Sequence, residues 1–174
     1  MSRAVFFDRD GVIIEPEIIN RKPYPVNNIA QVHIYSGTRD LMAILMKMGY
    51  LVFVVTNQPD IARGKQSADV VNEINQFLLD NLPIDEIFMC SHSDEDNCNC
   101  RKPKPGLLLL AKEKYDIDFS KSYLVGDRWK DIDAGYAVGC TTILVDRNYD
   151  EKWSFNTDFV IRDIEEVKEI INAN

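Results

Sequence analysis

Long apolar runs are missing from this sequence, and so is an excess of positive charge. No stretch reaches the roughly 20 apolar residues that a membrane-spanning helix needs, so we expect no membrane association. The 20 Lys and Arg residues are outnumbered by 28 Asp and Glu residues, which gives a formal charge of −8. A general nucleic-acid-binding protein needs a basic face, and this balance therefore argues against one. Internal repeats and low-complexity linkers are also absent.

The remaining composition is typical of one folded domain. The chain has 174 residues, of which 45% are hydrophobic, and this is enough for a packed core. We therefore expect residues 1–174 to form a single domain. The start, Met1-Ser2-Arg3, leads directly into an apolar segment, so we expect no signal peptide and a cytoplasmic protein.

Apolar segments of strand length alternate with helical patterns along the chain. Strands are expected at residues 4–7, 51–56, 86–89, 122–125 and 141–145, with a weaker one at 158–161. Helices are expected at residues 38–48, 68–82, 107–115, 131–138 and 163–172. This alternation predicts an α/β fold with a Rossmann-like, doubly wound, mainly parallel sheet and helices on both faces.

Residues 15–35 form the one long irregular segment of the sequence and contain Pro16, Pro23 and Pro25. Long loops inside a compact domain are usually functional or mobile. We interpret this segment as a short flap or hairpin beside the active site, with a passive surface loop as the alternative. The other segments are filled by the expected helices and strands, so no room remains for a large cap domain.

The first expected strand ends in two carboxylates one residue apart, Asp8 and Asp10, followed by Gly11. In extended backbone, residues two apart point the same way, and open α/β sheets bind ligands at the carboxyl ends of their strands. Two carboxylates at such a place suit Mg²⁺ or a nucleophile paired with a general acid. A strand followed by an ordinary polar turn is the alternative for this motif alone.

Polar residues also follow the other expected strands. The second strand leads into Thr56-Asn57-Gln58, Lys102 follows the third, and the fourth is followed by Gly126-Asp127 with Asp131 four residues later. Basic residues gather beside these strand ends and favour a phosphate site: Arg9, Arg63, Lys65, Arg101, Lys102, Lys104, Arg128 and Lys130.

Taken together and in this order, these motifs resemble the haloacid-dehalogenase-like (HAD) phosphatase superfamily. The match covers the chain from Phe6 to about Val145, and it is the ordered set rather than any one motif that is specific. The resemblance implies an Mg²⁺-dependent phosphatase in which Asp8 is the nucleophile and Asp10 the general acid and base. Thr56 and Lys102 would stabilise the phosphoryl group, and Mg²⁺ would be held by Asp8, the backbone carbonyl of Asp10, and Asp127.

The role of Asp131 stays open between two compatible interpretations. It could orient Lys102 or a metal-bound water, or it could cap the helix that follows. The presence of Asp10 favours phosphate transfer, because the resemblance implies that dehalogenating members lack this acid.

A second metal site is expected in the loop at about residues 90–101. Cys90, His92, Cys98 and Cys100 follow the pattern Cys-x-His-x5-Cys-x-Cys. Three thiolates and one imidazole suit tetrahedral Zn²⁺, and the residues between the two pairs are too polar for a buried cysteine cluster. With four protein ligands the zinc should be structural and should stiffen the loop that delivers Arg101 and Lys102.

Within the superfamily, this zinc loop and the segment from Thr56 to Gly64 are similar to the branch of heptose-bisphosphate phosphatases and histidinol-phosphatases. The resemblance implies a phosphorylated small-molecule substrate, a sugar bisphosphate first of all. Its contacts would come from Asn57, Gln58, Pro59, Arg101 and Arg128. Val12, Arg128 and the 15–35 segment depart from the usual heptose pattern, which leaves the sugar and its anomer open.

Other functions stay open at this point. The histidinol-phosphatase branch shares the zinc loop, whereas polynucleotide 3′-phosphatases are disfavoured by the acidic charge. A phospho-accepting receiver domain or a zinc-stabilised binding module would be a non-enzymatic alternative, although a receiver domain has no need of a zinc loop. We expect a monomer.

Overall fold

Six parallel strands form the central sheet, in the order β5-β4-β1-β6-β7-β8. The computed structural model describes residues 1–173. The strands are β1 (Ala4–Phe7), β4 (Leu51–Asn57), β5 (Glu86–Cys90), β6 (Tyr123–Gly126), β7 (Thr141–Val145) and β8 (Phe159–Ile161). The chain builds outward from β1 to β5 on one side and then from β6 to β8 on the other, so the sheet reverses its direction of growth between β1 and β6. The predicted doubly wound α/β fold is confirmed.

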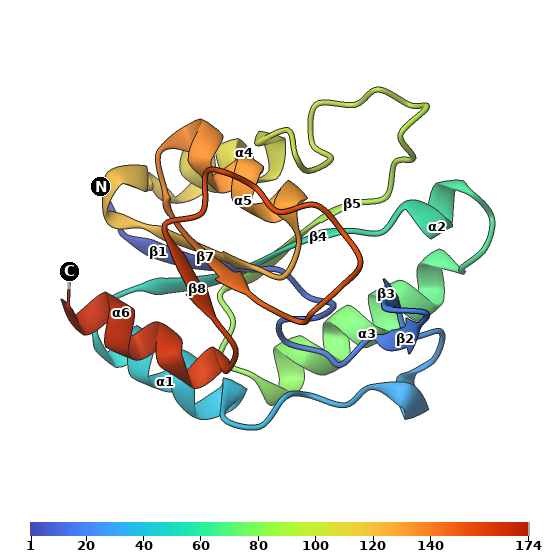
Figure 1. Ribbon diagram of the computed structural model, residues 1–174, viewed down its shortest axis with the longest axis horizontal. Coiled ribbons are helices and arrows are strands. Elements are labelled where there is room, and N and C mark those ends of the chain that lie inside the picture. Colours follow the sequence, from blue (N-terminus) through green and yellow to red (C-terminus); the bar gives the residue numbers. More distant parts are fainter. Residues whose placement is uncertain (174) are drawn as a thin grey trace.

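Helices cover both faces of this sheet (Figure 1). One face carries α1 (Thr38–Lys47), α3 (Ala68–Asn81) and α6 (Val167–Ala173), and the other carries α4 (Gly106–Tyr115) and α5 (Trp129–Val138). Alternate residues of β1 supply the two cores, because successive side chains of a strand point to opposite faces. Val5 and Phe7 pack on the first face, whereas Ala4 and Phe6 pack on the second.

Several short elements go beyond the sequence-based expectation. A four-residue helix, α2 (Pro59–Ala62), follows β4, and single 3₁₀ turns occur at η1 (Ile29–Gln31), η2 (Phe119–Lys121) and η3 (Ile164–Glu166). The last expected helix therefore begins as the η3 turn, with the Asp163 side chain accepting a hydrogen bond from the Glu165 amide, and continues as α6.

The 15–35 segment forms a small flap, as expected. Its two strands, β2 (Glu17–Ile19) and β3 (Lys22–Tyr24), pair only with each other. Asn20 and Arg21 connect them with φ of 51° and 60°, the two left-handed residues of a tight hairpin turn. The Arg21 side chain donates hydrogen bonds to Asn148, which ties the flap to the loop after β7.

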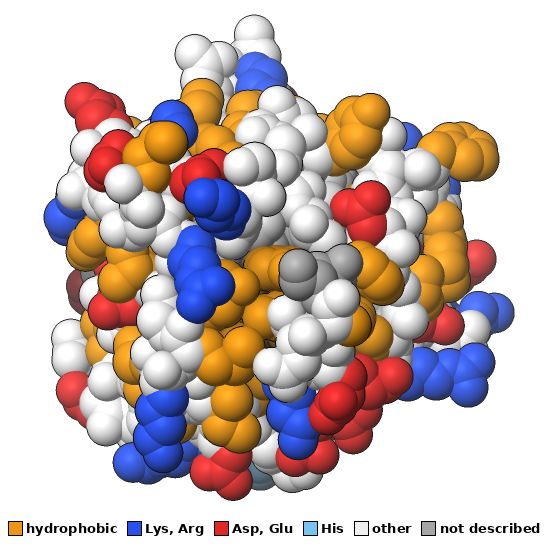
Figure 2. Space-filling view, turned by 90° about the vertical axis from the view of Figure 1, so that its left-hand side faces the viewer, with side chains coloured by type: hydrophobic (Ala, Val, Ile, Leu, Met, Phe, Trp, Pro, Cys, Tyr) orange, Lys and Arg blue, Asp and Glu red, His pale blue; other side chains and the backbone are white. Residues whose placement is uncertain are grey.

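The chain termini and the carboxyl ends of the strands lie at opposite ends of the molecule. The end that carries both chain termini shows acidic, basic and hydrophobic side chains interspersed (Figure 2). The opposite end carries the carboxyl ends of the strands, the flap and the cysteine-rich loop (Figure 1). Within residues 1–173, no helix combines the length and the apolar character that crossing a bilayer requires.

Candidate active site

Asp8 and Asp127 meet where the sheet reverses its direction of growth. Asp8 follows β1, and its backbone amide donates to the Val125 carbonyl of β6 at 2.9 Å. Asp127 follows β6 directly. Gly11 allows this approach: its φ is +89°, and a Cβ there would lie 1.8 Å from Asp127 Oδ2. The turn after β1 therefore requires glycine for steric as well as conformational reasons.

Lys102 is buried between two of the acidic residues. Its Nζ lies 2.9 Å from Asp8 Oδ1 and 2.6 Å from Asp131 Oδ1, and it donates to the Val55 carbonyl at 2.6 Å. Burial alone would lower the pKa of Lys102, but the Asp131 and Asp8 carboxylates outweigh it and raise that pKa. The ammonium group is therefore a fixed positive charge.

Asp131 pairs with Lys102, as the first interpretation expected, but it is not the N-cap of the following helix. Its Oδ1 pairs with Lys102, and its Oδ2 accepts the Arg128 backbone amide at 3.1 Å. It is the third residue of α5 rather than the N-cap, because the helix begins at Trp129, two residues earlier than expected. The same carboxylate thus satisfies an amide at the helix N-terminus and orients the lysine.

Asp8 and Asp127 fit a divalent cation. Burial and the nearby Asp131 raise the pKa of Asp8 from 3.8 to about 7, against the opposing effect of Lys102. Burial and Asp8 raise the pKa of Asp127 well above its usual value. Both carboxylate oxygens of Asp127 are buried without a hydrogen-bond partner. Carboxylate oxygens from Asp8, Asp127 and Asp131 lie within 4.8 Å of one another, so a hard cation such as Mg²⁺ would relieve their mutual repulsion.

The second carboxylate of the motif, Asp10, is fixed by two neighbours. Arg9 Nη2 lies 3.0 Å from Asp10 Oδ2, and Gln58 Nε2 donates to the same oxygen at 2.8 Å. Arg9 is completely buried, and its Nη1 donates to Asn75 of α3 at 2.9 Å. A buried guanidinium paired in this way holds the carboxylate in one orientation.

The carboxyl end of β4 and the residues directly after it support the site. Thr56 is buried, and its hydroxyl accepts a hydrogen bond from Gln58 Nε2 at 2.9 Å. Asn57 holds the Lys102 backbone: its Nδ2 donates to the Lys102 carbonyl at 3.0 Å, and its Oδ1 accepts the Lys102 amide at 3.1 Å. Pro59 begins α2. Of the residues that the sequence assigned to substrate, Gln58 is therefore engaged with Thr56 and Asp10.

A cavity of about 570 Å³ opens above these groups. Asp8, Asp10 and Lys102 contribute to it together with flap residues such as Glu17 and Tyr24. Its wall also includes Asn57, Pro59 and several cationic residues: Arg63, Lys65, Arg101, Arg128 and Lys130. A cavity with acids at its base and cations around them suits a phosphorylated molecule that carries more than one anionic group.

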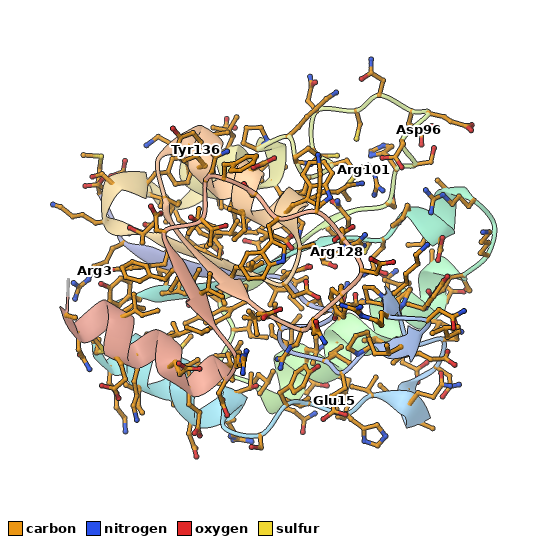
Figure 3. All side chains as sticks on the ribbon, in the orientation of Figure 1. Arg3, Glu15, Asp96, Arg101, Arg128 and Tyr136 are labelled. Atoms are coloured by element: carbon orange, nitrogen blue, oxygen red, sulfur yellow. The ribbon has the colours of Figure 1, made fainter. Side chains whose placement is uncertain are left out.

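Arg101 and Asp96 both belong to the cysteine-rich loop, and Arg128 lies below Arg101 in the view of Figure 3. Arg101 Nε donates to Asp94 Oδ1 at 2.8 Å, but its Nη1 is buried without a partner. Arg128 forms a two-point ion pair with Glu151, with distances of 2.9 Å from Nε and 2.5 Å from Nη2.

The four zinc-ligand candidates form a single cluster. Cys100 Sγ lies 3.3 Å from Cys90 Sγ, 3.4 Å from Cys98 Sγ and 3.3 Å from His92 Nδ1. Thiolates bound to tetrahedral Zn²⁺ at about 2.3 Å would be roughly 3.7 Å apart, so the cluster fits this ion. Hydrogen bonds from neighbouring groups, the Cys100 thiol first among them, overcome burial and lower the pKa of Cys98 to about 7.

Sequence reasoning missed several residues that shape the site. Arg9 was noted only as a basic residue, although an arginine between two aspartates is itself a signal for an internal ion pair. Asn75, Glu151 and Asp94 carry no local signal, because their importance comes from partners distant in the sequence. Tyr149 is also buried beside Asp127, and burial together with that carboxylate raises the pKa of Tyr149.

Comparison with known sequences finds that this chain is similar to phosphatases. The HAD-hydrolase-like family model matches residues 99–167. The D-glycero-alpha-D-manno-heptose-1,7-bisphosphate 7-phosphatase of Campylobacter jejuni is 31% identical over 98% of this chain and 95% of its own length. The corresponding beta-anomer enzyme of Vibrio cholerae is 39% identical over 82% of this chain and 80% of its own length.

Structural comparison agrees with the sequence relatives. A crystal structure of the D,D-heptose 1,7-bisphosphate phosphatase from B. bronchiseptica, complexed with magnesium and phosphate, superposes with a TM-score of 0.81. That protein is 27% identical, and the match covers 99% of each chain. The chain therefore belongs to the HAD phosphatases, in the family of the D-glycero-D-manno-heptose-1,7-bisphosphate 7-phosphatases.

Proposed function

We propose that this enzyme removes the 7-phosphate of D-glycero-D-manno-heptose 1,7-bisphosphate. The observation that carries the proposal is the convergence of Asp8, Asp10 and Lys102 on one cavity whose wall holds additional cations. The first group of residues suits the phosphate that reacts, and the other cations suit the phosphate that remains. The names of the curated relatives support this choice of substrate.

The chemistry follows from the placement of the two catalytic acids. An Asp8 oxygen attacks phosphorus, the bond to the sugar oxygen breaks, and Asp10 gives its proton to that oxygen. Asp10 then takes a proton from a water molecule, which attacks the phosphorus of the aspartyl-phosphate and releases inorganic phosphate and Asp8. Arg9 and Gln58 hold Asp10 in place for both proton transfers.

Charge stabilisation comes from fixed groups. Lys102 stabilises the phosphoryl oxygens, and the Thr56 hydroxyl can donate to them, because it serves Gln58 only as an acceptor. Mg²⁺ would be held by Asp8, Asp127 and the Asp10 carbonyl, and when bound it would neutralise charge on the transferred phosphoryl group. Lys102 opposes the burial that raises the pKa of Asp8, and a bound Mg²⁺ would favour the ionised carboxylate further.

A structural Zn²⁺ would be held by Cys90, His92, Cys98 and Cys100. When bound, it would stiffen the loop that runs directly into Arg101 and Lys102. Elemental analysis of the purified protein should find about one zinc per chain. Less than half an equivalent, in protein purified without chelators, would contradict the assignment.

The substrate proposal is tested by a kinetic panel with Mg²⁺. Both anomers of the heptose 1,7-bisphosphate, histidinol phosphate and a DNA 3′-phosphate end are compared by kcat/KM. One heptose anomer should exceed the other three compounds, and Asp8→Asn should abolish turnover of every compound. A higher kcat/KM for histidinol phosphate than for either heptose anomer would identify the enzyme as a histidinol-phosphatase. No turnover of any compound would favour a binding module.

A further inference from the structure

Three cations from three separate segments converge on one carboxylate, that of Asp94. Arg101 donates to it through Nε at 2.8 Å and through Nη2 at 3.3 Å. Arg63, directly after α2, reaches Asp94 Oδ2 at 3.3 Å, and Lys130 of α5 lies 4.0 Å from Oδ1. Asp94 belongs to the cysteine-rich loop, so this one side chain links α2, α5 and the loop.

The three cations face the substrate cavity, but their shared carboxylate does not. Arg63, Arg101 and Lys130 belong to the wall of the cavity that also contains Asp8 and Asp10, whereas Asp94 contributes nothing to that wall. The Arg101 side chain is only 10% exposed, and its Nη1 is buried without any hydrogen-bond partner. A guanidinium with one satisfied edge and one unsatisfied nitrogen is prepared to bind an additional anion.

The charges of these side chains explain how Asp94 keeps the three cations together. Three positive charges close together repel one another, and one carboxylate offsets only part of that repulsion. Arg63 also contacts Asp60 at 3.3 Å, which leaves the group of five charges with a net charge of +1. Cations that are already gathered lose less conformational freedom when a phosphate dianion arrives than cations that must be collected first.

We propose that Asp94 is a positioning residue that gathers Arg63, Arg101 and Lys130 into a binding site for the second phosphate of a sugar bisphosphate. This inference rests on the proposed function and deepens it, because it assigns the phosphate that is not removed to three specific cations. It also makes Asp94, which touches no substrate, a determinant of the preference for bisphosphates over monophosphates.

The test compares two substrates that differ only in the distal phosphate. KM and kcat are measured for D-glycero-D-manno-heptose 1,7-bisphosphate and for the matching heptose 7-phosphate. In Asp94→Asn, the KM ratio of monophosphate to bisphosphate should fall about tenfold from its wild-type value, the size expected when preorganised charges are released at a partly exposed site. Asp94→Glu, which keeps the charge, should recover part of the ratio.

A matched control removes the neighbouring charge instead. Glu95 is an exposed residue of the same loop, and Glu95→Gln changes the net charge equally without touching the three cations. It should leave both KM values at the wild-type level. Because Asp94→Asn could disturb the zinc loop, Arg63→Gln and Lys130→Gln serve as independent variants, and each should lower the same KM ratio. Zinc content and thermal midpoint are measured for every variant.

The outcomes separate this inference from the substrate proposal. If the wild-type enzyme shows no preference for the bisphosphate, the proposed function itself is wrong. If it shows the preference and Asp94→Asn retains it, only the role of Asp94 is wrong. A lower bisphosphate KM in Asp94→Asn would also overturn the inference, since Asp94 would then be a competitor of the phosphate rather than an organiser of its site.

Discussion

Asn57 holds the backbone of Lys102 through both ends of its side-chain amide. Its Nδ2 donates to the Lys102 carbonyl at 3.0 Å, while its Oδ1 accepts the Lys102 amide at 3.1 Å. The last residue of β4 therefore fixes the residue that follows the cysteine-rich loop, although 45 positions separate them in the sequence. This pairing brings the Lys102 ammonium to Asp8.

We expect Asn57→Ala to lower kcat by about 10- to 100-fold, because a catalytic group displaced by about 1 Å loses activity on that scale. Asn57→Asp should be intermediate, since a carboxylate can still accept the Lys102 amide but cannot donate to its carbonyl. Steady-state kinetics of the two variants measures the effect. Equal activity of wild type and Asn57→Ala would show that Asn57 does not position Lys102.

The raised pKa of Asp8 makes the stability of the metal-free protein depend on pH. The folded state binds this proton with a pKa of about 7, against an ordinary 3.8, so the folded state binds more protons than the unfolded state between these values. The contribution of Asp8 to stability therefore falls as the pH rises from 3.8 to about 7, and is constant above it.

In the Asp8→Asn variant, residue 8 cannot titrate, so this loss of stability with rising pH should not occur. In EDTA, the free energy of unfolding of Asp8→Asn relative to wild type should rise with pH across this window, by an amount on the order of 4 kcal/mol. Urea unfolding at a series of pH values measures the difference. A difference that stays constant from acid to neutral pH would mean that Asp8 does not titrate in the folded protein as described.

Gly11→Ala should destroy the Mg²⁺ site without touching a ligand. Its Cβ would lie 1.8 Å from Asp127 Oδ2 and 2.5 Å from Asp127 Cγ, so Asp127 or the turn after β1 must move. We expect Mg²⁺ to raise the thermal midpoint of the wild type but not that of Gly11→Ala. Gly64→Ala is the matched control: Gly64 also has positive φ, but an added Cβ meets nothing within 4 Å. An undiminished Mg²⁺ shift in Gly11→Ala would refute the packing argument.

Loss of zinc should reach the active site through the loop that connects them. Cys98→Ser removes one ligand candidate, and we expect it to lower zinc content, thermal stability and kcat/KM together. Cys140→Ser is the control, because Cys140 is buried away from the four-residue cluster and burial alone raises its pKa to about 12. Zinc content and kcat/KM that fall as far in Cys140→Ser as in Cys98→Ser would show that the loss is not specific to the ligand cluster.

The sequence predicts the large elements well because each apolar run ends in a polar residue or glycine. The strand expected at residues 141–145 is observed as β7 at those positions, and β4 extends only one residue beyond its prediction, to Asn57. The small elements are harder to predict from the sequence. The α2 helix has four residues, which is too short for a hydrophobic period to develop, and the flap turn lacks the glycine that usually marks a hairpin.

The residues of the site also fall into those that the sequence could assign and those that it could not. Asp8 and Asp127 could be assigned from sequence, because the carboxyl ends of neighbouring parallel strands meet at one edge of the sheet. The partnership of Arg9 with Asn75 spans 66 positions and depends on how α3 packs, for which no local pattern exists. The expected monomeric state and cytoplasmic location stay predictions.

The complete burial of Arg9 has a consequence for how this sequence can change over time. From Ala4 to Ile14, every side chain is buried except that of Asp10, which is of intermediate exposure. Each position in this stretch therefore serves the core, the turn or the reaction, and none can drift neutrally. A saturation library should find residues 4–14 the longest contiguous stretch with almost no tolerated replacements, Arg9→Lys included, because a lysine cannot reach Asp10 and Asn75 at the same time.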